Sequence, residues 1–199
     1  MKTAVITTGG LGSRLLTYTK TNPKTMLPLF TKSEDKLKEP MLRPLLEIIF
    51  ENLYDAGFRR FCIIVGTKTR DLIINHMNPD NEYLELLKTR NISLDKRFIT
   101  TLNRFYSKLD KCEIKWISQS TPMGFGHALL SAKNFVGKDS FLLHTGDAYF
   151  PNYQFLSNLL KNFHKNNSSG LLLLQRKKNL EGYGIAQIKK NKKNNYLIN

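Results

Sequence analysis

The sequence predicts an α/β fold in which a mostly parallel sheet is covered by helices on both faces. Apolar runs of strand length alternate along the chain with longer stretches in which apolar residues recur at helical spacing. This β–α–β alternation is typical of parallel sheets, because each crossover helix packs against a face of the sheet. In such sheets ligands bind beyond the carboxyl ends of the strands, and here glycines and polar residues follow several of the predicted strands.

The predicted strands are short apolar runs that end at glycine or at polar residues. They are residues 2–8, 61–65, 113–118, 141–144 and 170–175, with residues 183–188 as a further candidate. The chain shows no internal repeat. We therefore expect residues 1–199 to form a single domain, which is long enough to bury its own core.

The predicted helices carry apolar residues three and four positions apart. They are residues 43–56, 69–76, 81–109, 126–134 and 153–165. Gly57 follows the first of them as a C-cap. The third is long and charged, and we expect two helical pieces that break near Asn91.

The charge of the chain raises the question of a nucleic-acid partner and would also suit a small anionic ligand. There are 31 Lys and Arg residues against 16 Asp and Glu, a formal net charge of +15, which suits a polyanionic substrate. The basic residues are scattered and form no nucleic-acid-binding motif, so we expect no nucleic-acid partner. No apolar run approaches the ~20 residues that span a bilayer, so we expect no membrane partner.

The cysteines and the N-terminus favour a cytoplasmic protein. Cys62 and Cys112 lack CxxC spacing and therefore predict neither a disulfide framework nor a zinc site. The first residues, MKTAVITTGG, do not have the pattern of a secretory signal peptide.

The stretch TTGGLGSRLLTYTKTNPKTMLPL, residues 7–29, combines a glycine turn with two cations. It contains no P-loop string, and Leu15 stands where a dinucleotide fingerprint needs its third glycine. Glycines let backbone N–H groups approach an anion closely. Arg14 and Lys24 add positive charge beside them. The combination predicts a cradle for a triphosphate.

Two polar side chains follow later strands. The amide of Gln119 could pair with a carbonyl and the neighbouring N–H of uracil, although thymine presents the same edge. Asp147 follows the strand at 141–144, where its carboxylate is well placed to hold Mg²⁺. A turn-capping glutamine and a capping aspartate are the structural alternatives.

Three parts of the chain resemble the sugar-phosphate nucleotidylyltransferases. The first is GGLGSR followed by NPKTMLPL, which is similar to the family's N-terminal signature. The form TYTKTNPKTMLPLF and the stretches NHMNPDNEYLELLKTRN and SQSTPMGFGHALLSAKNFVG resemble its UTP–glucose-1-phosphate uridylyltransferase branch. The motifs occur in the family's order along essentially the whole chain. The resemblance implies a Rossmann-like three-layer sandwich with a mostly parallel mixed sheet, of the nucleotide-diphospho-sugar transferase type.

The resemblance also implies an activity and a set of site residues. The activity is transfer of a uridylyl group from UTP to glucose 1-phosphate, giving UDP-glucose and pyrophosphate, with Mg²⁺ as cofactor and a homo-oligomer as the assembly. Arg14 and Lys24 are the implied catalytic residues, Asp147 the metal ligand and Gly184 a sugar contact. The implied nucleotide-binding residues are Gly9, Gly10, Leu11, Gly12, Ser13, Arg14, Lys24, Gln119 and Gly124.

One departure from the family pattern leaves alternatives open. After the tyrosine–glycine strand around Gly184, family members continue with a Glu-Lys-Pro segment and a second metal-binding aspartate. We therefore expect this chain to lack the C-terminal part of the sugar-binding half. The alternatives are another hexose-1-phosphate nucleotidylyltransferase that uses dTTP or GTP, and a catalytically silent nucleotide-binding subunit. A panel of nucleotides separates the first, and a turnover measurement separates the second.

Overall fold

A computed structural model of the chain describes most of its residues. The described residues are 2–10, 12–31, 40–90, 96–121, 123–166, 168–190 and 196–198. They divide into two compact units, one ending at Leu156 and one beginning at Ser157, and each unit is described by itself. None of the described helices is long and apolar enough to cross a membrane.

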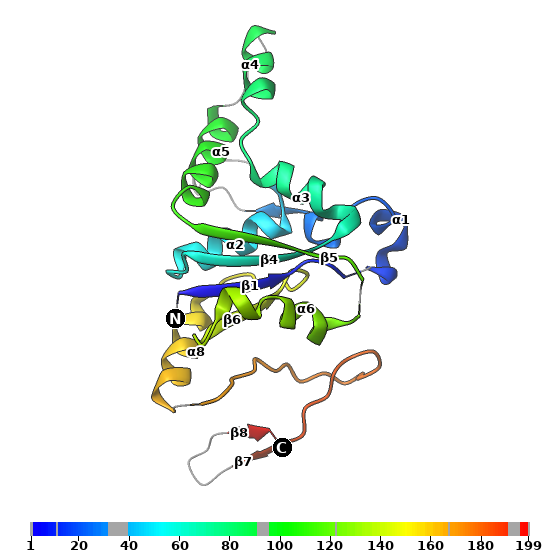
Figure 1. Cartoon of the computed structure of the whole chain (residues 1–199), viewed down its shortest axis with the longest axis vertical. Coiled ribbons are helices and arrows are strands. Elements are labelled where there is room, and N and C mark those ends of the chain that lie inside the picture. The colour runs from blue at the N-terminus through cyan, green and yellow to red at the C-terminus, as the bar shows by residue number, and fades with distance from the viewer. Residues whose placement is uncertain are drawn as a thin grey trace. The chain divides into compact units, whose positions relative to one another are not determined.

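The first unit is built on a four-stranded parallel sheet in the order β5-β4-β1-β6 (Figure 1). Its strands are β1 (Thr3–Thr7), β4 (Arg60–Gly66), β5 (Glu113–Gln119) and β6 (Phe141–Thr145). The four predicted strands of this region are confirmed, as is the α/β fold class. Within the described residues this sheet is wholly parallel, which agrees with the predicted mostly parallel sheet.

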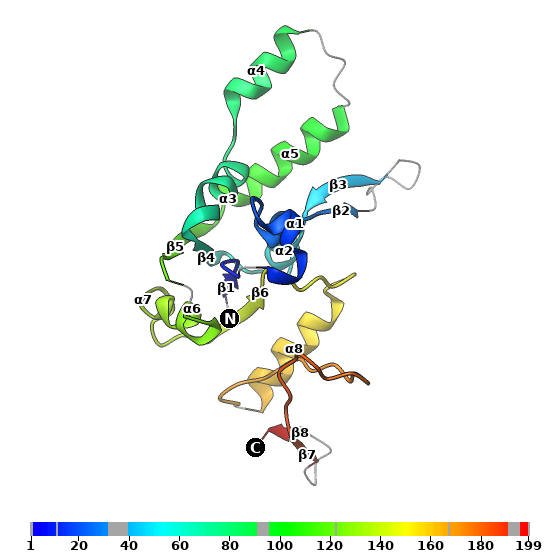
Figure 2. The same cartoon turned by 90° about the vertical axis from the view of Figure 1, so that its right-hand side faces the viewer.

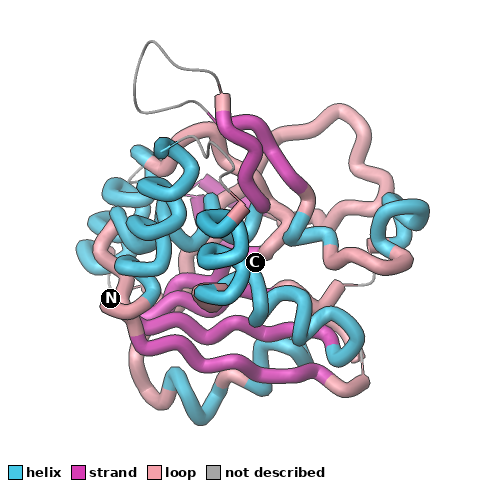
Figure 3. The backbone as a smooth tube through the Cα atoms, turned by 90° about the horizontal axis from the view of Figure 1, so that it is seen from above, coloured by secondary structure: helices cyan, strands magenta, loops and turns pink. Residues whose placement is uncertain are grey.

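Helices cover both faces of this sheet, which gives the three layers that the sequence predicts (Figures 1 and 3). The predicted helices are confirmed within a few residues at each end. The long charged stretch contains two helices, α4 and α5, and the break expected near Asn91 lies outside the described residues. The bounds of the helices are α2 Leu45–Asp55, α3 Arg70–Met77, α4 Asn81–Thr89, α5 Lys96–Leu109, α6 Phe125–Ser131, α7 Lys133–Val136 and α8 Gln154–Lys165. Shorter elements are η1 Ser13–Leu15, α1 Leu16–Thr19, η2 Lys24–Met26 and η3 Thr67–Thr69.

The core lies on the two faces of β1 and β4. Alternate residues of a strand point to opposite faces, so each strand contributes to two apolar layers. In one layer Val5, Cys62 and Ile64 pack against two alanines. Ala128 belongs to α6, and Ala132 directly follows that helix. In the other layer Phe61 packs against Phe50 of α2, with ring centroids 4.8 Å apart.

A hairpin that the sequence did not predict follows η2 directly. Strands β2 (Pro28–Thr31) and β3 (Met41–Pro44) pair antiparallel, and Figure 2 shows them extending away from the sheet. Each strand has four residues and begins or ends at a proline. Phe30 is 74% exposed. Such short, exposed strands carry almost none of the alternation by which strands are recognised.

One strand that the sequence predicts in the second unit is not formed. Residues 170–175 form no strand, and Leu171 to Leu174 are between 41% and 62% exposed. Besides the part of α8 that follows Leu156, the regular structure of this unit within the described residues is a small antiparallel pair, β7 (Ile188–Lys190) with β8 (Tyr196–Ile198). Only the last residue of the candidate strand 183–188 therefore lies in a strand. An apolar run can fill a strand only where a neighbouring strand accepts its backbone hydrogen bonds.

Candidate active site

A cavity of about 520 Å³ lies at the carboxyl ends of β1, β5 and β6. The parallel register brings these ends together, because Thr7 pairs with Thr145 and Gly66 pairs with Gln119. The described lining residues are Thr7, Thr8, Gly9, Gly10, Gly12, Ser13, Lys24, Thr25, Gln119, Gly124, Phe125, Ala128, Thr145 and Asp147. The size suits a ligand as large as a nucleotide.

Close packing explains the glycines at two positions around this cavity. A Cβ on Gly9 would lie 3.3 Å from both Gln119 Oε1 and the amide nitrogen of Gly66, so the glycine turn and the end of β5 are in direct contact. Gly12 has φ +63°, in the left-handed region, where its Cβ would also meet Thr19 Cγ2 at 2.6 Å. The turn therefore depends on glycine for its path as well as for its exposed backbone.

An ion pair between Lys24 and Asp147 crosses the cavity. Lys24 Nζ donates to Asp147 Oδ2 at 2.7 Å, and the two side chains are 33% and 47% exposed. Partial burial works against ionisation of Asp147, but the hydrogen bond and the charge of Lys24 outweigh it, and the pKa of Asp147 falls below its ordinary value. Residues that are 123 positions apart in the sequence thus form one charged centre.

The described lining of the cavity offers one carboxylate, which fits a magnesium ion that is shared with a phosphate ligand. No group of three or more His, Cys, Asp or Glu side chains within the described residues could hold a metal by itself. Asp147 is ionised and partly exposed at the cavity. Mg²⁺ in nucleotide sites is usually bound by one or two carboxylates together with phosphate oxygens and water. Asp147 is the residue here that would hold it.

The amide of Gln119 is held from the N-terminal end of α6. Its Nε2 lies 3.5 Å from the carbonyl oxygen of Gly124 and 3.3 Å from His127 Nδ1. The main-chain oxygen of Gln119 accepts from Thr67 Oγ1 at 3.3 Å. The end of β5 is therefore tied to both neighbouring loops.

Three of the predicted site residues lie outside this arrangement. Arg14 is exposed in η1 and does not line the cavity. Leu11 falls outside the described residues. Gly184 belongs to the second unit.

The cavity also contains residues that sequence reasoning missed. The side chain of Thr25 is buried, and its hydroxyl has no hydrogen-bond partner within the described residues. Thr8 is buried too and donates to the carbonyl of Ile64 at 2.8 Å. Phe125 is half exposed at the start of α6. Thr8 and Thr25 are direct neighbours of predicted residues, and this adjacency is the signal that could have found them.

His144 has a structural role beside the cavity. Its Nδ1 lies 2.7 Å from the carbonyl oxygen of Thr145, to which it donates, and its Nε2 lies 2.8 Å from the hydroxyl of Tyr153. Burial lowers the pKa of His144 despite the hydrogen bond to Thr145 and the charge of Asp147. The neutral imidazole has both nitrogens occupied, so it is not a free base.

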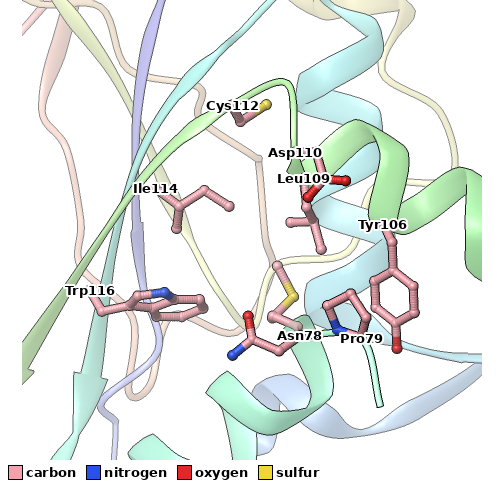
Figure 4. Close-up of a pocket in the computed structure, with 9 residues that line it drawn as sticks. Asn78, Pro79, Tyr106, Leu109, Asp110, Cys112, Ile114 and Trp116 are labelled. Carbon is pink, nitrogen blue, oxygen red and sulfur yellow. The ribbon is translucent and has the colours of Figure 1, made fainter. Parts of the chain in front are cut away.

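A second cavity, of about 290 Å³, shares no lining residue with the first (Figure 4). It lies between the ends of α3 and α5 and the first half of β5, where Ile114 and Trp116 point into it (Figure 4). None of the predicted site residues lines it. The predicted site residues that line a cavity therefore all line the one at the carboxyl ends of the strands.

The chain belongs to the nucleotidyl transferase family, whose model matches residues 3–197. This confirms the family that the sequence motifs resemble. A UTP–glucose-1-phosphate uridylyltransferase of Bacillus subtilis, YngB, is 32% identical over 74% of this chain and 43% of its own length. The low-salt glycan biosynthesis nucleotidyltransferase Agl11 of Haloferax volcanii is 28% identical over 92% of this chain and 40% of its own. The chain thus spans less than half the length of these two relatives.

Solved structures agree with the fold. The UTP-bound UGPase of Acinetobacter baumannii has a TM-score of 0.65 at 22% identity, covering 84% of this chain and 54% of that protein. The UDP-glucose pyrophosphorylase of the same organism has a TM-score of 0.67 with the same identity and coverage. At this level of identity the likeness shows a shared architecture.

Proposed function

We propose that the chain transfers a uridylyl group from UTP to glucose 1-phosphate, giving UDP-glucose and pyrophosphate. The observation that carries the proposal is the Lys24–Asp147 pair at 2.7 Å in a cavity that also contains the glycine turn and Gln119. A charged centre beside exposed backbone N–H groups suits a triphosphate, and an amide at the other side suits a base. The names of the Bacillus subtilis relatives favour UTP and glucose 1-phosphate.

The proposed reaction requires little acid–base catalysis from the protein. The phosphate of glucose 1-phosphate has a second pKa of ~6 and is already largely dianionic at neutral pH. Its oxygen can attack the α-phosphorus of UTP without a general base, and no covalent intermediate with the protein is needed. The protein must position the two phosphates in line and neutralise the charge on the transferring group and on pyrophosphate.

Lys24 and Asp147 are the residues for that task. In the absence of ligand each neutralises the other. We propose that the triphosphate competes with Asp147 for Lys24, because its charge is greater than that of a single carboxylate. Lys24 then contacts phosphate, and the freed carboxylate of Asp147 would hold Mg²⁺, which would supply further charge neutralisation when bound. Arg14 is proposed as a second cation that reaches the phosphates from the glycine turn.

Calorimetry with separate ligands tests this function. We expect measurable binding of Mg·UTP, and pyrophosphate release in the presence of glucose 1-phosphate. Asp147→Asn should sharply weaken the Mg²⁺ dependence of UTP binding while the fold persists, and Asp139→Asn is the matched control because its side chain is 75% exposed. Unchanged metal dependence in Asp147→Asn would remove Asp147 from the site.

The same titration separates the alternatives. Tighter binding of dTTP or GTP than of UTP would indicate another nucleotidylyltransferase. Binding of UTP without pyrophosphate release would favour a nucleotide-binding subunit. Failure of a folded sample to bind any of these nucleotides would contradict the proposed function.

A further inference from the structure

The orientation of the Gln119 amide follows from its neighbours. A carbonyl oxygen only accepts hydrogen bonds, so the amide atom that faces the carbonyl of Gly124 at 3.5 Å is the donor Nε2. The same Nε2 lies 3.3 Å from His127 Nδ1. Because an amide nitrogen donates hydrogen bonds and does not accept them, His127 Nδ1 is the acceptor in this contact. In the tautomer that fits this contact, the ring proton is on Nε2.

The other end of the amide is the part left for a ligand. Both hydrogens of Gln119 Nε2 point toward acceptors on the first turn of α6 and its N-cap. Gln119 Oε1 accepts no hydrogen bond from a described residue, and it lies toward the glycine turn, 3.3 Å from where a Cβ on Gly9 would be. In this arrangement Gln119 offers the cavity an acceptor.

The helix that carries His127 is firmly seated. The neighbouring Ala128 is 6% exposed and packs in the cluster with Val5, Cys62 and Ile64. Gly124 allows the sharp entry into α6 through its φ of +94°. His127 itself is exposed, so its imidazole makes contact with Gln119 without being part of the core. Its position is therefore fixed by the backbone rather than by packing of its own ring.

We propose that His127 is a positioning residue that determines base specificity by holding Gln119 with its acceptor toward the base. Uracil has an N–H at position 3 that can donate to Oε1. Cytosine has a lone pair there, which Oε1 would repel. With His127 absent, the amide of Gln119 could turn over and present Nε2, which would accommodate cytosine. This inference rests on the proposed function, because it takes UTP as the nucleotide.

Thymine supplies an internal control for this role. It has the same carbonyl and N–H edge as uracil, so His127 should affect UTP and dTTP equally. A change that merely loosened the site would weaken the binding of UTP, dTTP and CTP together. A change in the amide orientation alone should move CTP in the direction opposite to UTP and dTTP.

The experiment is calorimetry of Mg·UTP, Mg·dTTP and Mg·CTP with the wild-type chain and three variants. In His127→Phe the ratio of UTP to CTP affinity should narrow by about fivefold to tenfold, the worth of one hydrogen bond, with the UTP to dTTP ratio unchanged. His127→Gln retains an acceptor within reach and should restore most of the ratio. Ser131→Ala removes a hydroxyl of the same helix that donates to the carbonyl oxygen of Ala128 at 2.6 Å, and it should leave all affinities unchanged.

The outcomes distinguish this inference from the proposed function. If the wild type binds UTP but His127→Phe keeps the UTP to CTP ratio, the positioning role is wrong and the function stands. An equal loss of all three nucleotides in His127→Phe would also overturn the role. If the folded wild type binds none of the nucleotides, the proposed function itself fails.

Discussion

Two apolar runs of similar length differ in both secondary structure and burial. Residues 61–65 form the middle of β4, and every one of them is 0% exposed. Residues 171–174, all leucines, are 41% to 62% exposed and form no strand. Composition therefore does not separate the two runs.

The difference lies in their neighbours. Strand β4 is flanked by β1 and β5, which accept and donate its backbone hydrogen bonds along its length, and α2 and α6 cover its faces. No described strand pairs with residues 171–174. Burial and backbone pairing come together in a sheet, so an apolar run without a neighbouring strand gains neither.

The largest expected effect contrasts a charge placed in each run. Ile63→Lys buries an ammonium group without a partner in the central strand, and we expect it to lower the free energy of unfolding by more than about 4 kcal/mol. Leu172→Lys, at a position 62% exposed, should change it by no more than about 0.5 kcal/mol. Urea unfolding followed by circular dichroism measures both. A large loss in Leu172→Lys would show that this run is buried in the protein in solution.

A second contrast compares one lysine from each unit. Lys24→Met and Lys177→Met remove the same charge, but Lys24 pairs with Asp147, whereas Lys177 lies 3.9 Å from the ring centroid of Tyr183. Loss of a charge-assisted contact should weaken Mg·UTP binding by about 10-fold to 100-fold in Lys24→Met. Lys177→Met should leave it nearly unchanged.

Lys24→Met should weaken nucleotide binding, but it should strengthen the binding of a metal ion by itself. Without its lysine partner, Asp147 should bind Mn²⁺ more tightly than in the wild type when no nucleotide is present. Titration followed by electron paramagnetic resonance measures this affinity. Equal nucleotide affinity in the two lysine variants would mean that net charge alone attracts UTP, and Lys24 would lose its assigned role.

Much of the fold could be predicted from the sequence because its two central strands, β1 and β4, are buried on both faces. The runs at β1, β4 and β6 are continuous and apolar, and their turns place glycine or polar residues next. The β2–β3 hairpin could not be predicted, since its short strands are exposed and gain little from burial. The prediction of a strand at 170–175 was wrong for the opposite reason. An apolar run does not reveal whether a neighbouring strand exists to pair with it.

The candidate site divides in the same way. Gly9, Lys24, Gln119 and Asp147 could be found because each follows a strand or a recognisable motif, and the parallel register then gathers them. The contact from His127 to Gln119 could not be found. It depends on the angle at which α6 leaves Gly124, which no spacing in the sequence encodes.

The first unit also buries charge, and this gives a dependence of stability on pH. Glu47 is 5% exposed and accepts from Arg43 Nε at 2.6 Å and from His76 Nε2 at 3.2 Å. Burial opposes ionisation of Glu47, but these partners outweigh it and lower its pKa from the ordinary 4.5. A lowered pKa in the folded state stabilises the protein above pH 4.5, and that contribution is lost as the pH falls through the folded value.

Glu47→Gln tests this dependence. The variant should be less stable by about 2 kcal/mol at neutral pH, because it keeps the shape of Glu47 and loses its charged hydrogen bonds. The difference from wild type should shrink below pH 4.5. Glu113→Gln, at a side chain 58% exposed, is the control and should have a much smaller effect. Thermal unfolding across this pH range supplies the measurement, and a constant difference at all pH values would contradict the assignment.

The last comparison concerns a glycine in each unit. A Cβ on Gly146 would lie 2.6 Å from Thr25 Cγ2 and 2.8 Å from the carbonyl oxygen of Thr7, so Gly146→Ala must displace the backbone beside Asp147. Overpacking of this kind costs about 1–3 kcal/mol, and Mg·UTP binding should weaken with it. A Cβ on Gly184 would meet no atom of the described residues within 4 Å, and its backbone is outside the left-handed region.

Gly184→Ala should therefore leave the free energy of unfolding within about 0.5 kcal/mol of wild type, as for an exposed substitution, and the affinity for Mg·UTP within about twofold. Gly184 remains a predicted sugar contact, so its variant should change only the affinity for glucose 1-phosphate. Calorimetry with the two ligands on one sample measures both quantities. A loss of UTP affinity in Gly184→Ala that equals the loss in Gly146→Ala would show that the second unit contributes to the nucleotide site, and the assignment of that site to the first unit alone would be wrong.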